Sequence, residues 1–158
     1  MKTLKSSGVG IWGFTLAWFA FIIFLSSQPG EATAKISLAL ARFLLRLLNL
    51  HESRLDALHA FLRTTAHFVG FFVLGALLYA AMRMTRQKMG NIHFWAAGIV
   101  SVLGVLDEIK KVFISGRHLS WAEAGLNVIG AWCGIIAAMA VMGLISASSK
   151  AGAPDGAA

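Results

Sequence analysis

The chain alternates between long apolar segments and short polar connections. An α-helix needs about 20 residues to cross the apolar core of a bilayer. Four segments meet that length, at about residues 9–26, 58–82, 92–114 and 120–145. We therefore expect one membrane domain over residues 1–147 and a small, polar, disordered tail over 148–158. The first segment ends in SSQPG rather than in a cleavage site, which favours a retained anchor.

The connection after the first segment has a different pattern. Over about residues 32–50, Lys35, Arg42 and Arg46 recur at helical spacing on one narrow face, with isoleucine and leucine elsewhere. This stretch is too short and too charged to span a bilayer comfortably, which favours an amphipathic helix lying at the membrane interface. The predicted fold class is an all-α membrane protein with four transmembrane helices and one interfacial amphipathic helix.

Composition supports the membrane assignment. The 158 residues are 58% hydrophobic and 13% charged, with a net charge of +7, whereas soluble domains are about 25% charged. We attribute the positive charge to contact with anionic membrane lipids and expect no nucleic-acid partner. Cys133 is the single cysteine, so no intrachain disulfide can form.

Basic residues do not decide the orientation of the chain. Cytoplasmic loops of membrane proteins carry an excess of lysine and arginine. Counted over the whole chain, the basic residues mildly favour an outer N-terminus, whereas the short, purely basic connection RMTRQK favours an inner one. Charge alone leaves both orientations open.

Polar residues converge on one face of the membrane. With four spans, the end of the first meets the start of the second, and the end of the third meets the start of the fourth. The candidate catalytic residues there are His67, Asp107, Glu108, Arg117, Glu123 and Asn127. The candidate substrate contacts are Ser26, Gln28, Arg63 and Lys111. Ionisable groups inside a membrane are costly and usually face the bundle interior.

Structural roles explain several of these residues equally well. Asp107 and Glu108 can both pair with Lys111 on one helix face. Ser120 and Glu123 form a capping-box pattern, in which each side chain accepts a backbone N–H at a helix start.

Stripes of small residues predict close packing of the third and fourth spans. The stripe on the third span is Ala97, Ser101, Gly104 and Glu108. The stripe on the fourth is Glu123, Asn127, Gly130 and Gly134. Small residues let helix backbones approach in membranes. The two stripes would point Glu108 toward Asn127.

The same residues also suit chemistry. A histidine beside carboxylates and arginines suits acid–base catalysis or the binding of an anionic group. His67 and the carboxylates are metal-ligand types, but no short ligand motif accompanies them, and we predict no metal site. Phosphate-loop, nucleophile-elbow, zinc-protease and haem motifs are absent, which leaves any cofactor unknown.

Three stretches form an ordered set of motifs: SSQPG, TTAHFVGFFVLG and DEIKKVFISGRHLSWAEAGLNVIGAWCG. The set resembles the VanZ-like family of small bacterial membrane proteins, named for an accessory protein of glycopeptide resistance. The resemblance implies a bacterial cytoplasmic membrane, cytoplasmic termini, an outward-facing site and a link to tolerance of teicoplanin-type antibiotics. The matching positions are His67, Phe68, Leu74, Gly75, Asp107, Glu108, Phe113, Gly116, Arg117, Asn127, Gly130 and Gly134.

Five positions depart from the family pattern. Thr64 replaces a lysine, Gly70 a glutamate, Phe71 a tyrosine, Lys111 a glutamine and Glu123 an aspartate. Three functions stay open: an enzyme acting on a lipid-linked or cell-envelope substrate, a non-catalytic binder of a lipid or lipopeptide, and, with less support, a small transporter or channel subunit. Oligomeric state is not predicted.

Overall fold

The computed structural model describes residues 2–86 and 90–151, and these residues are almost entirely helical. The helices are α1 (Lys2–Ser26), α2 (Gly30–Leu47), η1 (Glu52–Arg54), α3 (Leu55–Thr85), α4 (Ile92–Lys110), η2 (Lys111–Phe113) and α5 (Trp121–Ala151). Helix α5 continues through residues 148–151, where the disordered tail was predicted to begin. The rest of that tail, residues 152–158, lies outside the described residues.

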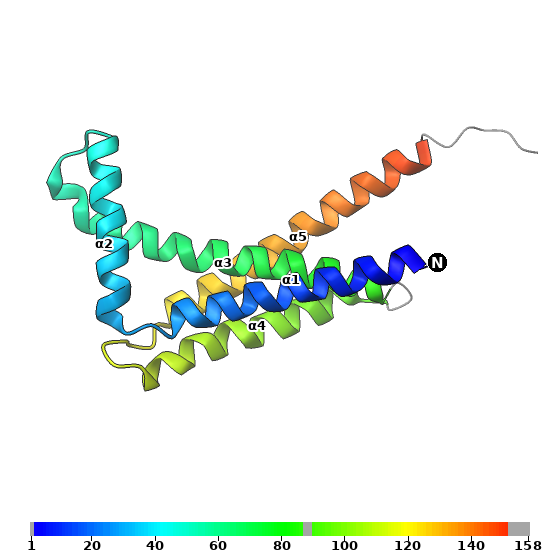
Figure 1. The fold of residues 1–158 in the computed structure, drawn as a ribbon, viewed down its shortest axis with the longest axis horizontal. Coiled ribbons are helices and arrows are strands. Elements are labelled where there is room, and N and C mark those ends of the chain that lie inside the picture. The colour runs from blue at the N-terminus through cyan, green and yellow to red at the C-terminus, as the bar shows by residue number, and fades with distance from the viewer. Residues whose placement is uncertain (1, 87–89, 152–158) are drawn as a thin grey trace, which may run out of the picture.

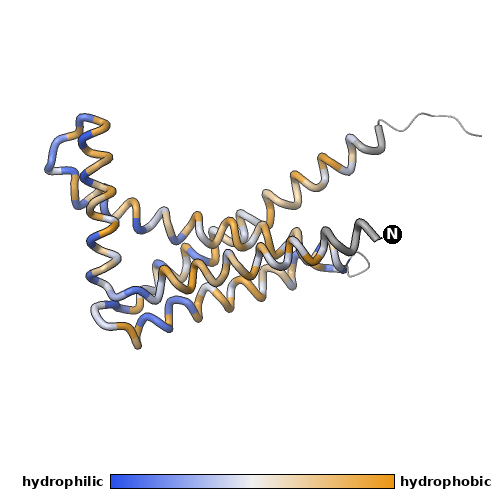
Figure 2. Tube along the Cα trace, in the orientation of Figure 1, coloured by the Kyte–Doolittle hydropathy of each residue, from blue (hydrophilic) through white to orange (hydrophobic). Residues whose placement is uncertain are grey.

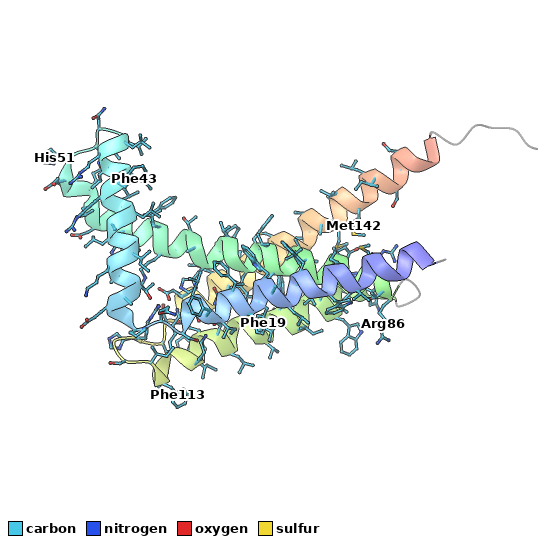
Figure 3. All side chains as sticks on the ribbon, viewed as in Figure 1. Phe19, Phe43, His51, Arg86, Phe113 and Met142 are labelled. Atoms are coloured by element: carbon cyan, nitrogen blue, oxygen red, sulfur yellow. The ribbon has the colours of Figure 1, made fainter. Side chains whose placement is uncertain are left out.

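Four helical stretches are long and apolar enough to cross a membrane: Gly8–Ser26, Glu52–Thr85, Ile92–Phe113 and Trp121–Ser148. Large apolar side chains project outward from these helices (Figure 3), and Phe113 is 86% exposed. Such surfaces suit lipid, because a helix satisfies its own backbone hydrogen bonds without water. The predicted all-α membrane fold with four spans is therefore confirmed.

The amphipathic helix forms as α2, and local sequence sets its ends. Pro29 is the N-cap residue, with φ −51° and ψ 146°, so the helical backbone begins only after it, at Gly30. Asn49, just beyond the last turn, has φ +50°, a left-handed conformation that commonly ends helices. Helix α2 crosses one end of the bundle, whereas α1, α3, α4 and α5 run along it (Figure 1).

Hydrophilic and apolar residues are separated along the length of the bundle. The end of the bundle beside α2 carries the hydrophilic residues of α2, the end of α4 and the start of α5 (Figure 2). The middle of the bundle is mainly apolar (Figure 2), and the start of α1 and the end of α5 lie at the opposite end (Figure 1). The helix order therefore gathers the polar residues at one end, as the four-span topology predicts.

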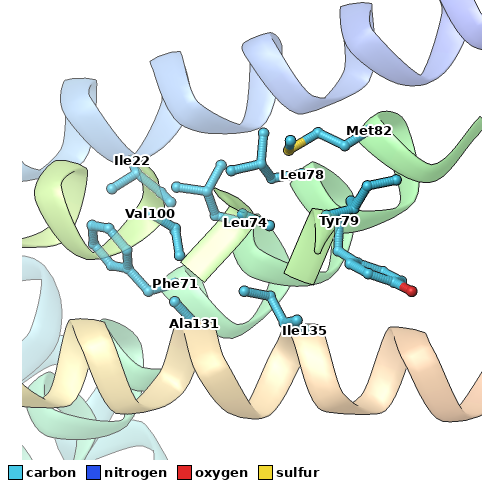
Figure 4. Close-up of a cluster of buried hydrophobic side chains, with 11 residues drawn as sticks. Ile22, Phe71, Leu74, Leu78, Tyr79, Met82, Val100, Ala131 and Ile135 are labelled. Carbon is cyan, nitrogen blue, oxygen red and sulfur yellow. The ribbon is translucent and has the colours of Figure 1, made fainter. Parts of the chain in front are cut away.

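The core is built around α3. Phe71 and Leu74 of α3 are each 1% exposed and belong to a buried cluster that includes residues of all three other spans. Because lipid tails are as apolar as leucine, packing rather than removal from water holds such helices together. The buried cluster is Ile22, Phe71, Leu74, Leu78, Tyr79, Met82, Ile92, Ala96, Val100, Ala131 and Ile135 (Figure 4).

The small residues of α5 face α3 rather than α4. A Cβ atom added to Gly130 would overlap the carbonyl oxygen of Phe68, and one added to Gly134 would overlap that of Phe72. The predicted use of this stripe against the third span is therefore wrong for both glycines. Asn127 of the stripe meets α4, where its Cβ lies 3.0 Å from the position of a Cβ on Gly104, and Glu123 contacts Lys111 just beyond the end of α4.

We expect Gly134→Ala to destabilise the bundle. Its methyl group would force α5 away from the α3 backbone, and overpacking of this kind costs about 1–3 kcal/mol. Gly143→Ala on the same helix is the matched control, because a Cβ there meets nothing within 4 Å and alanine favours a helix by up to about 1 kcal/mol. Thermal unfolding of the two variants in one detergent measures the difference. Equal midpoints would contradict close packing at Gly134.

Candidate functional site

Buried charges occupy the end of the bundle beside α2. Asp107, Glu108 and Lys111 are each at most 2% exposed, although they end an apolar helix. Burying a charge is unfavourable unless it is paired and hydrogen-bonded. The side chains around these residues form two groups, one centred on Asp107 and the other on Lys111.

The Asp107 group joins the end of α1 to the end of α4. The Oδ1 atom of Asp107 accepts a hydrogen bond from the Ser26 hydroxyl and lies 2.9 Å from the Lys110 Nζ atom. Lys110 also donates to the Ser26 Oγ atom at 2.6 Å and to the carbonyl of Ile23 at 3.3 Å. The Oδ2 atom of Asp107 is buried with no hydrogen-bond partner among the described residues. This group ties α1 to α4.

The Lys111 group joins α3, α4 and α5. The Lys111 Nζ atom lies 2.6 Å from the Oε2 atom of Glu108 and 2.6 Å from the Oε2 atom of Glu123. The Nε2 atom of His67 is 3.3 Å from the same ammonium. The contact with Glu108 is an ion pair without hydrogen-bond geometry. One lysine thus holds side chains from three helices.

Two further side chains support this group. Arg63 donates to the Oε1 atom of Glu123 at 2.8 Å. Asn127 is fully buried, and its Nδ2 atom donates to the Gly104 carbonyl at 3.1 Å. Because that amide nitrogen is used, the Asn127 Oδ1 atom faces the Nδ1 atom of His67, 3.1 Å away, and accepts a hydrogen bond from its N–H.

Of the two hydrogen bonds predicted for the capping box at the start of α5, one forms as predicted and the other has a different acceptor. The Ser120 hydroxyl accepts the backbone N–H of Glu123 at 3.3 Å. The reciprocal bond comes from Glu108 of α4, whose Oε1 atom accepts the backbone N–H of Ser120 at 2.9 Å. The prediction that Glu123 caps its own helix is therefore wrong. Lys111 and Arg63 engage the Glu123 carboxylate instead.

Two expected pairings also differ. Lys111 pairs with Glu108, three residues earlier, as expected, but Asp107 pairs with Lys110 rather than Lys111. Glu108 was expected to point toward Asn127, and it instead contacts Lys111 and the Ser120 amide. Asn127 contacts His67 and Gly104.

A cavity of about 190 Å³ adjoins the Lys111 group. The start of α2, the α4–α5 connection and the start of α5 surround it, with Arg63, Lys111, Arg117, His118 and Glu123 in its wall. The two loops at its rim meet backbone to backbone: the Gly30 N–H donates to the Ser115 carbonyl at 3.2 Å, and a Cβ on Gly30 would overlap the Gly116 carbonyl.

Arg117 lines this cavity, and its hydrogen-bond partners are neutral groups. Its Nε atom donates to the Gln28 backbone carbonyl at 3.2 Å and its NH2 atom to the Thr33 hydroxyl at 2.6 Å. It forms no ion pair with any residue of the described ranges. Burial and the nearby charge of Arg63 lower the pKa of Arg117 below its usual value, and the neighbouring carboxylates offset only part of that decrease. Arginine stays protonated at neutral pH, so this positive charge is available to an anion.

Charge counting supports the same conclusion. Asp107, Glu108 and Glu123 are matched by Lys110, Lys111 and Arg63 through the ion pairs above. Arg117 is left over beside a small cavity. Within the described part of the site, Arg117 can therefore bind an anion while each internal carboxylate keeps its own cation.

The VanZ/LLP1 family profile matches residues 11–143, which is most of the chain. The chain belongs to the VanZ/LLP1 family. Membership in the VanZ/LLP1 family and four apolar helices together make it a multi-pass membrane protein. No curated protein and no solved structure matches it.

In this VanZ/LLP1 member, some of the residues that match the family pattern line the cavity and others are buried away from it. Arg117 and Glu123 line the cavity, and His67 contacts Glu123 at 3.2 Å. Asp107, Glu108 and Asn127 are buried and do not line it. Of the predicted substrate contacts, Arg63 and Lys111 line the cavity, whereas Ser26 bonds to Asp107 and the Gln28 amide donates back to Phe24 within its own helix end.

The departures from the VanZ/LLP1 pattern fall in different surroundings. Lys111 and Glu123 are at the centre of the ion pairs. Phe71 belongs to the apolar core, and the Gly70 carbonyl accepts the indole N–H of Trp18 at 3.0 Å. Gly70 and Phe71 therefore serve packing against α1 and the core.

Three residues of the site were missed from sequence. Lys110 had a usable signal, because it lies three residues after Asp107 on one helix. Thr33 and His118 had none: their position at the cavity depends on the approach of α2 to the α4–α5 connection.

Proposed function

We propose that this protein binds the anionic headgroup of a lipid or a lipid-linked cell-envelope molecule. The observation that carries the proposal is Arg117, a partly buried arginine with neutral partners beside a cavity of about 190 Å³. Guanidinium groups match phosphate and carboxylate oxygens with paired donors. A cavity of this size suits a headgroup rather than a whole drug-sized molecule, which needs about 300–1,000 Å³.

The position of the cavity supports a ligand that arrives from the membrane. It lies at the polar end of the bundle, where α2 meets the spans. Away from that end the residues of the spans are mainly apolar (Figure 2). A molecule with an acyl or isoprenoid chain can rest along the spans while its charged end reaches Arg117. We place this end at the outer half of the bacterial cytoplasmic membrane, with both termini in the cytoplasm.

The proposal is one of binding and includes no reaction. Asp107, Glu108 and Asn127 are buried and engaged by partners within the protein. A general acid or base must reach the substrate proton within hydrogen-bond distance. Of the predicted catalytic set, Arg117 and Glu123 line the cavity. Arg117 suits recognition of an anionic group, whereas Glu123 is already paired with Arg63 and Lys111.

We expect Arg117→Gln to lose headgroup binding. Purified protein in nanodiscs would be titrated with phosphatidylglycerol, with the phosphate of a long isoprenoid alcohol, and with neutral phosphatidylcholine. Wild type is expected to bind one or both anionic molecules and not the neutral lipid, and the anionic molecule that binds identifies the source of the headgroup. Removing a charge-assisted pair of hydrogen bonds should weaken binding by about 10-fold or more.

Arg46→Gln is the matched control, since Arg46 is exposed on α2 and makes the same change of charge. Binding that survives in Arg117→Gln, or falls equally in both variants, would contradict the proposal. A deletion strain challenged with a teicoplanin-type antibiotic gives the cellular readout. Complementation by Arg46→Gln but not by Arg117→Gln would link the site to antibiotic tolerance.

A further inference from the structure

The Lys111 ammonium is surrounded by three side chains of metal-ligand type. His67, Glu108 and Glu123 each offer one ligand atom, and the three atoms lie within 4.8 Å of one another. The ammonium nitrogen is 2.6 Å from each of the two carboxylates and 3.3 Å from the imidazole. A cation therefore already occupies the space that these ligands enclose, and it is the end of a lysine side chain.

The imidazole is oriented as a metal ligand would be. The Asn127 amide donates to the Gly104 carbonyl, so its oxygen accepts the Nδ1–H of His67. The His67 Nε2 atom then lies 3.3 Å from the ammonium and 3.2 Å from the Glu123 Oε2 atom. Histidines that bind metals almost always donate their other ring N–H to a neighbouring acceptor in this way.

The charges also fit a doubly charged ion. Glu108 and Glu123 supply two negative charges, while Lys111 and Arg63 supply two positive charges. If the lysine charge were removed, a divalent ion could neutralise both carboxylates, because the Arg63 side chain is 46% exposed and can turn toward water. Lys111 and Glu123 line the cavity, so the cavity gives a route by which an ion could reach these ligands.

We propose that His67, Glu108 and Glu123 form a latent divalent-metal site in which the Lys111 ammonium takes the place of the ion. The inference goes beyond anion binding, because it concerns the cation that holds the three helices together. Nitrogen and carboxylate ligands in a set of three with an open position suit Zn²⁺. Zinc bonds to such ligands are about 2.0–2.2 Å long, so the ligand atoms would move inward from their positions around the ammonium.

Lys111→Gln tests the inference, because glutamine removes the charge and retains hydrogen-bonding groups. The variant, purified in nanodiscs after metal removal, would be titrated with Zn²⁺ by calorimetry, and bound zinc would be counted by mass spectrometry. We expect one Zn²⁺ per chain in Lys111→Gln and none in wild type. Lys110→Gln is the matched control, since Lys110 belongs to the Asp107 group, and it should bind none.

Further variants in the Lys111→Gln background locate the ion. His67→Ala should abolish the binding, and Asn127→Ala, which releases the imidazole, should weaken it by about 10–100-fold. A folded Lys111→Gln protein that binds no zinc, or binds it equally well without His67, would overturn the inference. So would wild type binding as tightly as the variant. Failure of Lys111→Gln to accumulate in cells supplied with Zn²⁺ would also overturn it, because the ion should replace the missing charge. None of these outcomes depends on headgroup binding.

Discussion

Replacing Lys111 with methionine is expected to lower the free energy of unfolding by about 3–5 kcal/mol in the absence of metal, the range for removing one partner of a buried ion pair. The lysine side chain is 1% exposed and neutralises Glu108, which is equally buried. Glu123 keeps Arg63 as a partner, whereas Glu108 would keep only the Ser120 amide. The cost arises because the Glu108 charge is left unmatched. Unfolding in denaturant, followed by tryptophan fluorescence, measures it.

A second substitution separates charge from packing. In Lys111→Met/Glu108→Gln the glutamine oxygen can still accept the Ser120 N–H, and no unpaired charge remains at position 108. Most of the lost stability should return. Lys35→Met is the matched single control, since Lys35 is exposed on α2, and it should change stability by no more than about 0.5 kcal/mol. A double variant less stable than Lys111→Met would show that packing is the main contribution of the lysine.

Asp107→Leu is expected to reduce the amount of folded protein without changing how each folded molecule binds its ligand. The leucine leaves Lys110 and Ser26 without their shared acceptor, at a cost of about 3 kcal/mol, the lower end for a broken buried pair. The lower end applies because the Lys110 side chain is 27% exposed and can turn toward water. Membrane abundance by immunoblot and headgroup binding per folded molecule are the two measurements.

Asp107→Asn and Asp56→Asn complete the series. Asparagine at 107 keeps one oxygen for Ser26 and Lys110, so its effect should be smaller than that of leucine. Asp56 is exposed at the start of α3, and its substitution should have almost no effect. Normal abundance of Asp107→Leu with loss of binding would instead give Asp107 a direct part in function.

The spans can be predicted from the sequence because each is recognised by the length of its apolar segment alone. A helix must present about 20 apolar residues to cross a bilayer, and each of the four stretches does so without help from its neighbours. The amphipathic α2 is equally local, since its basic residues repeat at helical spacing. The gathering of polar residues at one end then follows from connecting the four spans by short turns.

Pairings inside the site depend on information that sequence does not carry. Both Lys110 and Lys111 lie within reach of Asp107 on one helix, at three and four residues, and side-chain pairs at either spacing can form. Glu123 matches a capping pattern, but two cations from α3 and the end of α4 bind it more strongly than a backbone N–H would. Likewise, Gly134 indicates that another helix can approach α5 closely at this position, but only the tertiary arrangement shows that this helix is α3.

The order of synthesis matches the order in which charges acquire partners. Asp107, Glu108, Lys110 and Lys111 lie within one turn or so at the end of α4, so this segment can enter a bilayer with no net charge of its own. Glu123 follows on α5 and arrives after Lys111 and after Arg63 of α3. Asp107, Glu108 and Glu123 are therefore each made beside, or later than, a base that neutralises them. In a chain inserted from its N-terminus, no carboxylate of the site enters the lipid on an earlier helix than the base that neutralises it.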